Sequence, residues 1–301
     1  MSKRSVIFFL LAVIALIPSR SHARATSANA NIFFPAMYSP YLSVDQSLTL
    51  QQWRWQAGIF MHEAKNPLEA RLSGTQPFGV IDHLLIGDLF GVVGLTDWWQ
   101  AGLSVPVVFY EEFNDIATKT SSKSLQMSDV RFEMKFNLLD PFLNKIGISV
   151  SPYVLFPTGS GERFVGNNSF AGGLEAIVDG RIGDRLRMAL NLGYRARDGV
   201  IVLNTEQDDQ FTYGLGANLK TWRWLEAIGE VYGNTSHFFS NAAESPIEFL
   251  AGLRFFPKDP ERFSITPFGG VGLTSGLGSP DIRVGVSITY SPVSSTSVVG
   301  K

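Results

Sequence analysis

Strict alternation of apolar and polar residues constrains this chain more than any other feature of its sequence. In residues 129–138, "DVRFEMKFNL", five apolar residues from Val130 to Leu138 alternate with charged or polar residues. A period of two indicates a β-strand with one apolar and one polar face. The apolar face covers a core in a soluble sheet, whereas in a membrane barrel it faces lipid and the polar face lines the lumen.

The alternation recurs along the chain and predicts strands of about ten residues, the length that crosses a bilayer. About twelve strands are expected, starting near residues 48, 83, 98, 128, 146, 170, 186, 210, 225, 246, 263 and 281. Short connections such as "IGDR" alternate along the chain with longer loops rich in Gly, Asn and Ser. This asymmetry predicts an all-β fold: a transmembrane antiparallel up-and-down β-barrel with short periplasmic turns, longer extracellular loops and both termini in the periplasm.

The first residues of the chain predict export. Lys3 and Arg4 precede an apolar run over residues 6–17, which is typical of a signal peptide and too short to span a membrane. The expected organisation is a signal peptide (1–23), a periplasmic N-terminal segment (24–46), an outer-membrane β-barrel (47–291) and a disordered periplasmic tail (292–301). The chain has no cysteine, which excludes disulfides and a lipoprotein anchor.

The free-energy cost of placing charged side chains in lipid indicates which face of the strands contacts the bilayer. Turning Arg131 and Lys135 towards the bilayer midplane would cost about 2–4 kcal/mol each, most of a typical folding margin. The charged face is therefore expected to line the lumen. By parity the lumen-facing candidates are Arg54, Asp88, Arg131, Glu133, Lys135, Glu175, Asp179, Arg187, Arg195, Lys220, Glu226, Glu230, Glu248, Arg254 and Arg283.

Aromatic residues gather near the predicted strand ends, where membrane interfaces favour them. The expected aromatic girdle consists of Trp98, Trp99, Trp222, Trp224, Tyr110, Phe156 and Tyr290. Across the "TWRW" turn, Lys220 and Glu226 are expected to face each other as a cross-strand pair.

The sequence offers no pattern for catalysis. The histidines are far apart and have no acidic or histidine partner at metal-ligand spacing, so no metal, no cofactor and no catalytic residue are expected. A formal charge of -2 gives no reason to expect nucleic acid. The expected partners are outer-membrane lipid and the barrel-assembly machinery during insertion, and a homo-oligomer stays open.

The chain resembles the N-terminal barrel of large OmpA-family outer-membrane proteins. The likeness runs through "FFPAMYSPYLSVDQS", "MSDVRFEMKFNLLDP" and "GLGSPDIRVGVSITYSP", and it consists mainly of Gly, Pro and aromatic spacings. In that family a wall-binding domain follows the barrel, but here only "SPVSSTSVVGK" follows Tyr290. The resemblance therefore implies a Gram-negative outer-membrane barrel without peptidoglycan anchoring.

Two functions follow equally well from the polar lumen: a passive porin-like channel, or a structural barrel closed by its own salt bridges. Inward glycines, among them Gly214 and Gly216, are expected to leave space for a narrow water-filled path. The alternatives are a barrel-borne lipid-modifying enzyme and a soluble periplasmic binding barrel.

Overall fold

The computed structural model describes residues 29–70, 78–114, 121–123, 125–159, 163–167, 169–202, 205–236, 242–257 and 262–292. The expected signal peptide and almost all of the expected tail lie outside these ranges. The elements are β1 (Trp55–Ala70), β2 (Phe78–Thr96), β3 (Trp99–Asn114), β4 (Ser121–Lys123), β5 (Gln126–Met127), β6 (Val130–Leu139), β7 (Ile146–Phe156), β8 (Ala171–Ile182), β9 (Leu186–Ala196), β10 (Val200–Val202), β11 (Thr205–Gln207), β12 (Gln210–Trp222), β13 (Leu225–Thr235), the 3-10 helix η2 (Ala242–Glu244), β14 (Ile247–Phe255), β15 (Phe263–Gly272) and β16 (Ile282–Tyr290). No helix among the described residues is long and apolar enough to cross a membrane.

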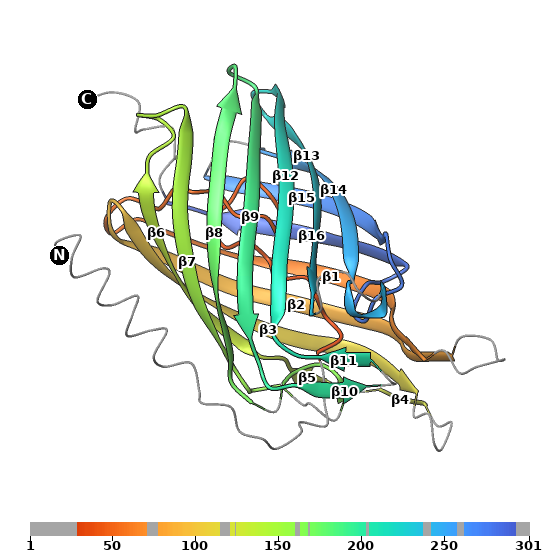
Figure 1. Ribbon diagram of the computed structural model, residues 1–301. Coiled ribbons are helices and arrows are strands. Elements are labelled where there is room, and N and C mark those ends of the chain that lie inside the picture. Colours follow the sequence, from red (N-terminus) through yellow and green to blue (C-terminus); the bar gives the residue numbers. More distant parts are fainter. Residues whose placement is uncertain are drawn as a thin grey trace.

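Twelve long strands form a closed antiparallel barrel, as the sequence predicts. Each long strand pairs with its neighbours in the chain, β16 pairs with β1, and β2 pairs with β3, so no edge is left open (Figure 1). Closure is what a β-structure needs in lipid, because an open edge would leave backbone groups without hydrogen bonds.

The two ends of the barrel differ. Short turns join β2 to β3, β6 to β7, β8 to β9, β12 to β13 and β14 to β15, and we call this the short-turn end. The opposite, long-loop end carries the small strands β4, β5, β10 and β11, which lie together in the lower part of Figure 1. There β4 and β5 continue the pairing of β3 beyond β6.

The outer surface of the strands is apolar. Large side chains that alternate with inward polar residues remain exposed, including Leu103, Val178, Leu215, Phe249 and Val284. Such a belt would be unstable in water and matches the lipid-facing band of a membrane barrel. The inward positions hold the charges, so the polar face lines the lumen.

Aromatic side chains of the expected girdle lie at both ends of the strands. At the short-turn end, Trp222 stacks on Trp224 with ring centroids 5.7 Å apart, and Trp55 lies 5.9 Å from Tyr290. The Trp99 ring stacks on Phe136 at 5.7 Å, and Trp98 lies beside it. At the other end of their strands, Tyr110 lies near the end of β3 and Phe156 is the last residue of β7.

Candidate functional site: a lumen occupied by the N-terminal segment

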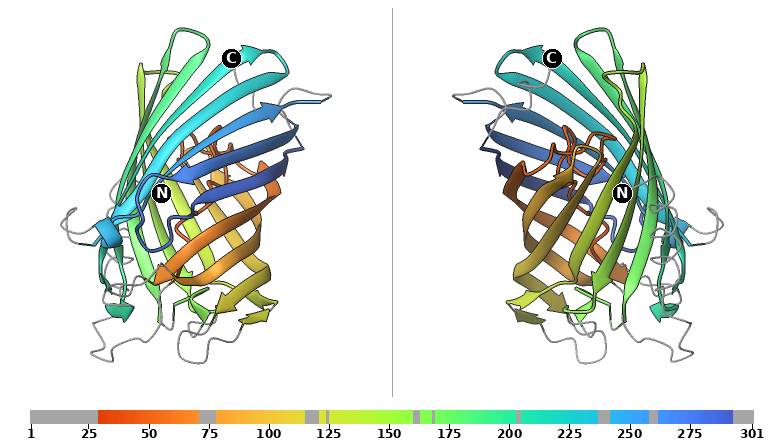
Figure 2. Two further views of the ribbon diagram at one scale, coloured as in Figure 1. Left: turned by 90° about the vertical axis from the view of Figure 1, so that its right-hand side faces the viewer. Right: turned by 90° about the vertical axis from the view of Figure 1, so that its left-hand side faces the viewer.

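The lumen is filled in part by the chain's own N-terminal residues. We call residues 29–50 the luminal segment; Figure 2 shows it in orange-red inside the ring of strands. Its first residues lie at the long-loop end, where the Ala30 amide donates to the Phe164 carbonyl at 2.7 Å. Its last residue, Leu50, donates to Gln100 Oε1 at 2.8 Å, near the start of β3 at the short-turn end. The segment therefore runs through the length of the barrel.

This course corrects one expectation. Residues 29–46 of the expected periplasmic segment (24–46) lie inside the lumen, because lumen-facing carboxylates and apolar side chains bind them there. Among the described residues, the chain begins at Asn29 at the long-loop end, whereas β16 ends at the short-turn end. Asn29 and the end of β16 therefore lie at opposite ends of the barrel, and the placement of both chain termini in the periplasm stays a prediction.

Glu230 of β13 binds the centre of the luminal segment. Its Oε1 accepts hydrogen bonds from the Ser43 amide and hydroxyl, both at 2.8 Å. Its Oε2 accepts from the amides of Leu42 at 3.0 Å and Val44 at 3.4 Å. One carboxylate thus satisfies three consecutive backbone donors, which stabilises a turn that has no regular secondary structure.

Further polar contacts hold the segment to β6, β8 and β9. Lys135 Nζ of β6 lies 2.6 Å from Asp45 Oδ1, and the Asp45 amide donates to Asn191 Oδ1 at 3.0 Å. The Ser47 hydroxyl donates to Asp179 Oδ1 at 2.5 Å. The buried lysine and aspartate each have a counter-ion, which is the condition for holding charges away from water.

Apolar side chains pack the segment against the remaining wall. Phe33, Met37, Tyr41 and other segment residues form one core with residues of β1, β2, β9 and β13–β15. The expected space above the inward glycines is taken here. A Cβ added at Gly216 would meet Tyr41 Cδ1 at 2.8 Å, and one added at Gly214 would meet Val44 Cγ2 at 3.0 Å. These glycines therefore make room for side chains of the luminal segment, and the space beside them is not a water-filled path.

A buried charge network lies beside Phe33, across β14, β16, β1 and β2. Arg283 donates to Glu248 with two nitrogens, Nε at 2.7 Å and Nη2 at 3.1 Å. Its Nη1 lies 2.9 Å from His62 Nδ1, which must accept because a guanidinium can only donate. His62 Nε2 therefore carries the proton and donates to Asp88 Oδ2 at 3.2 Å. The Phe33 ring covers the guanidinium at 5.2 Å.

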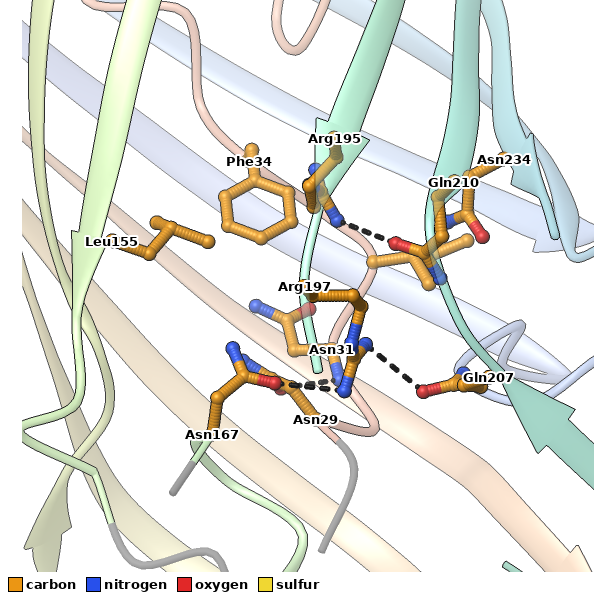
Figure 3. Close-up of a pocket in the computed structure, with 11 residues that line it drawn as sticks. Asn29, Asn31, Phe34, Leu155, Asn167, Arg195, Arg197, Gln207, Gln210 and Asn234 are labelled. Atoms are coloured by element: carbon orange, nitrogen blue, oxygen red, sulfur yellow. Dashed lines mark hydrogen bonds between the residues drawn. The ribbon is translucent and has the colours of Figure 1, made fainter. Parts of the chain in front are cut away.

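Open volume lies on the other side of the segment, along β6–β13. A cavity of about 80 Å³ is lined by charged residues of β6, β8 and β9 and by the segment's Ile32, Phe34, Ser43 and Val44. A smaller one of about 10 Å³ lies nearer the long-loop end (Figure 3). Ile32, Phe34, Arg195 and Asn234 line both, so they form the boundary between the two.

Arg197, just beyond β9, organises the smaller cavity. It donates to Asn167 Oδ1 at 2.8 Å and to Gln207 Oε1 at 3.1 Å, as Figure 3 shows. Burial lowers the pKa of Arg197 to about 10, so the guanidinium stays charged at neutral pH. Asn167 in turn donates to Asp129 at 2.8 Å, and burial raises the pKa of that carboxyl. These bonds hold the loop after β7 against the mouth of the barrel.

Most of the lumen-facing candidates point inward. The inward set is Asp88, Arg131, Glu133, Lys135, Glu175, Asp179, Arg187, Arg195, Glu226, Glu230, Glu248, Arg254 and Arg283. Arg54 lies before β1 and is exposed at the short-turn end, and Lys220 shares the inward face of β12 but is exposed at the same end. The register places Lys220 opposite Glu226 as expected, and Glu226 accepts a hydrogen bond from Asn218 at 3.0 Å.

Sequence reasoning missed the luminal segment as a functional element. One signal was available: residues 33–47 are rich in Phe, Tyr, Met and Leu, too apolar for a strand-free stretch left in water. No sequence pattern pointed to Glu230 as its partner, since the two are 188 residues apart.

Solved structures similar to this one include two outer-membrane proteins. The COG4313 outer membrane channel from Pseudomonas putida F1 aligns over 81% of this chain and 97% of its own, with a TM-score of 0.60 and 11% identity. The NanC porin aligns over 79% and 98%, with a TM-score of 0.52 and 8% identity. Comparison with protein-family models and with curated proteins finds no match. The fold is that of an integral outer-membrane β-barrel.

Proposed function

We propose that this protein is an outer-membrane channel for small polar solutes, with its path along the β6–β13 side of the luminal segment. The observation that carries the proposal is the charged cavity of about 80 Å³ between the segment and that wall. In a structural barrel closed by its own salt bridges, the luminal charges would contact each other. Here part of the charged wall borders open volume instead.

The proposed path is narrow and weakly selective. Arg131, Glu133, Glu175 and Arg195 bring both signs to the same cavity, so their fields largely cancel beyond a Debye length of about 8 Å. The smaller cavity of about 10 Å³ limits the path at the long-loop end. We therefore expect a small unit conductance. Both solved neighbours are named as a channel or a porin, which agrees with this proposal.

A structural barrel is the second candidate. It is favoured by the close fit of the luminal segment, whose core residues Phe33, Tyr41 and Leu42 are almost fully buried. This candidate predicts a folded barrel that passes neither ions nor solutes.

Planar-bilayer recordings and liposome swelling separate the two. Purified protein that shows the heat-dependent gel mobility of a folded barrel should give small single-channel steps and admit small polar solutes. Folded protein that gives neither steps nor swelling would refute the channel and leave the structural barrel.

Orientation and partners belong to the same proposal. We infer that the short turns face the periplasm, that lipid surrounds the strands, and that the assembly machinery inserts them. The resemblance to the barrels of large OmpA-family proteins stays a prediction and adds no activity to this proposal.

A further inference from the structure

The cavity of about 80 Å³ is lined by one basic and one acidic side chain without a direct counter-ion. Glu175 of β8 and Arg195 of β9 both line it. The register pairs Glu175 with Gly193 and Arg195 with Gly173, so the two side chains are diagonal neighbours on adjacent strands. Charges withdrawn from bulk water are costly unless a partner neutralises them. This cavity therefore presents a guanidinium and a carboxyl group to whatever occupies it.

Arg195 is held in place by neutral groups. Its Nε donates to the Tyr153 hydroxyl at 3.0 Å and its Nη1 donates to Gln210 Oε1 at 3.1 Å. The Phe34 ring lies 4.4 Å from the guanidinium carbon. Among the residues that the structure describes, no carboxylate forms an ion pair with Arg195. The guanidinium is thus oriented, and its charge is available to a ligand.

Glu175 is the matching acid. Its carboxylate makes no hydrogen bond and no ion pair with any described residue. The neighbouring bases are engaged elsewhere: Arg131 lies 3.8 Å from Glu133, and Lys135 lies 2.6 Å from Asp45.

A third group points to a ligand with an acceptor oxygen. Asn191 of β9 is 2% exposed and lines the same cavity. Its Oδ1 accepts from the Asp45 amide, but its Nδ2 has no partner among the described residues. A buried amide donor left unpaired costs about 1–3 kcal/mol, which a ligand oxygen would recover.

We propose that this cavity binds a small zwitterion of the amino-acid class. The carboxylate of the ligand faces Arg195 and Asn191 Nδ2, and its ammonium faces Glu175. The inference rests on the proposed function, because it names the solute class of the same path. A cavity of about 80 Å³ has room for a ligand of a few non-hydrogen atoms, such as glycine or alanine. A simple carboxylate would meet Glu175, and a simple amine would meet Arg195.

Three ligands of one shape test the proposal: L-alanine, L-lactate, which lacks the ammonium, and L-alaninol, which lacks the carboxylate. Binding to the full-length barrel in detergent is measured by saturation-transfer NMR titration. We expect alanine to bind about tenfold more tightly than either analogue, the value of one charge-assisted hydrogen bond. In Glu175→Gln the preference over lactate should vanish, and in Arg195→Gln the preference over alaninol should vanish. A purely structural role would not shift selectivity in opposite directions.

The turn between the same two strands provides matched controls. Asp184→Asn and Arg185→Gln each remove one exposed charge from the β8–β9 turn and should leave the alanine preference unchanged. Equal binding of the three ligands, no binding at all, or equal weakening of all three by both cavity variants would overturn the proposal. Because the titration needs no membrane, a barrel that prefers alanine but does not conduct refutes the channel alone. A conducting barrel without that preference refutes the binding site alone.

Discussion

Replacing Glu230 by glutamine should release the luminal segment from the barrel wall. The carboxylate accepts four hydrogen bonds from residues 42–44, two on each oxygen. A glutamine keeps one acceptor oxygen and places an amide donor against the remaining two donors. At least two charge-assisted bonds are lost, each worth about 1.5–3 kcal/mol, while the neutral amide is cheaper to bury. We expect a net loss of about 2–3 kcal/mol, which raises the undocked population about 30- to 150-fold.

Thiol labelling can measure this population, because the chain contains no cysteine. Ala36→Cys places a small reporter in the luminal segment at a position only 7% exposed. When opening and closing are fast, the rate of maleimide labelling follows the open fraction. In the Glu230→Gln background, labelling should therefore accelerate by about the factor given above.

Glu63→Gln is the matched control, since Glu63 is a half-exposed carboxylate of β1 that contacts His83 and not the luminal segment. It should leave the labelling rate unchanged, and both variants should keep the gel mobility of a folded barrel. An equal labelling rate in Glu230→Gln and in the parent would refute the claim that this carboxylate holds the segment.

Three further predictions concern the barrel itself. Met134→Arg places a charge in lipid and should lower the free energy of unfolding in bilayers by about 2–4 kcal/mol, whereas Glu133→Gln should lower it only slightly. Equal losses of unfolding free energy in denaturant titrations would contradict the facing of the strands. Arg283→Met leaves Glu248 buried without its partner and should lower the free energy of unfolding by about 3–5 kcal/mol. The double variant with Glu248→Leu should recover most of this loss, and a double variant as unstable as the single one would argue against the ion pair. Deleting residues 292–301 should leave insertion intact by heat-dependent gel mobility, and loss of folded barrel would show that the tail is needed.

The strands could be predicted from sequence because their signal is local. Alternation along one strand distinguishes the lipid-facing from the lumen-facing side without any long-range information. It predicted strand starts near residues 146, 186, 210, 225 and 263, and β7, β9, β12, β13 and β15 begin at these residues. The facing of the charges followed from the same parity together with the cost of burying charge in lipid.

The start of β1 could not be predicted in the same way. A strand was expected near residue 48, but β1 begins at Trp55. Residues 50–54 instead leave the lumen over the β2–β3 turn: Gln52 donates to Asp97 at 3.0 Å, and the Trp53 amide donates to the Gly94 carbonyl at 2.8 Å. Trp53 adopts a φ of 59°, which breaks the extended chain at this point.

The occupied lumen also lay beyond local reasoning. The glycines at 214 and 216 correctly indicated space on the inner face, but parity cannot say what fills it. Tyr41 and Val44 fill it through contacts that span well over a hundred residues of sequence. The cavity also depends on these contacts. The luminal segment forms polar contacts with Lys135 and Glu230, whereas Glu175 and Arg195 line the cavity without an ion pair to the segment.

The proposed channel is tested most directly by its conductance when the luminal segment is locked in place. A Cβ at Gly214 lies 3.0 Å from Val44 Cγ2, so the pair Val44→Cys and Gly214→Cys is within disulfide reach. Planar-bilayer recordings compare the oxidised and the reduced double variant. We expect the same small unit conductance in both, because the proposed path runs beside the luminal segment. Steps that vanish on oxidation and return on reduction would contradict it, since conduction would then require the segment to leave the lumen.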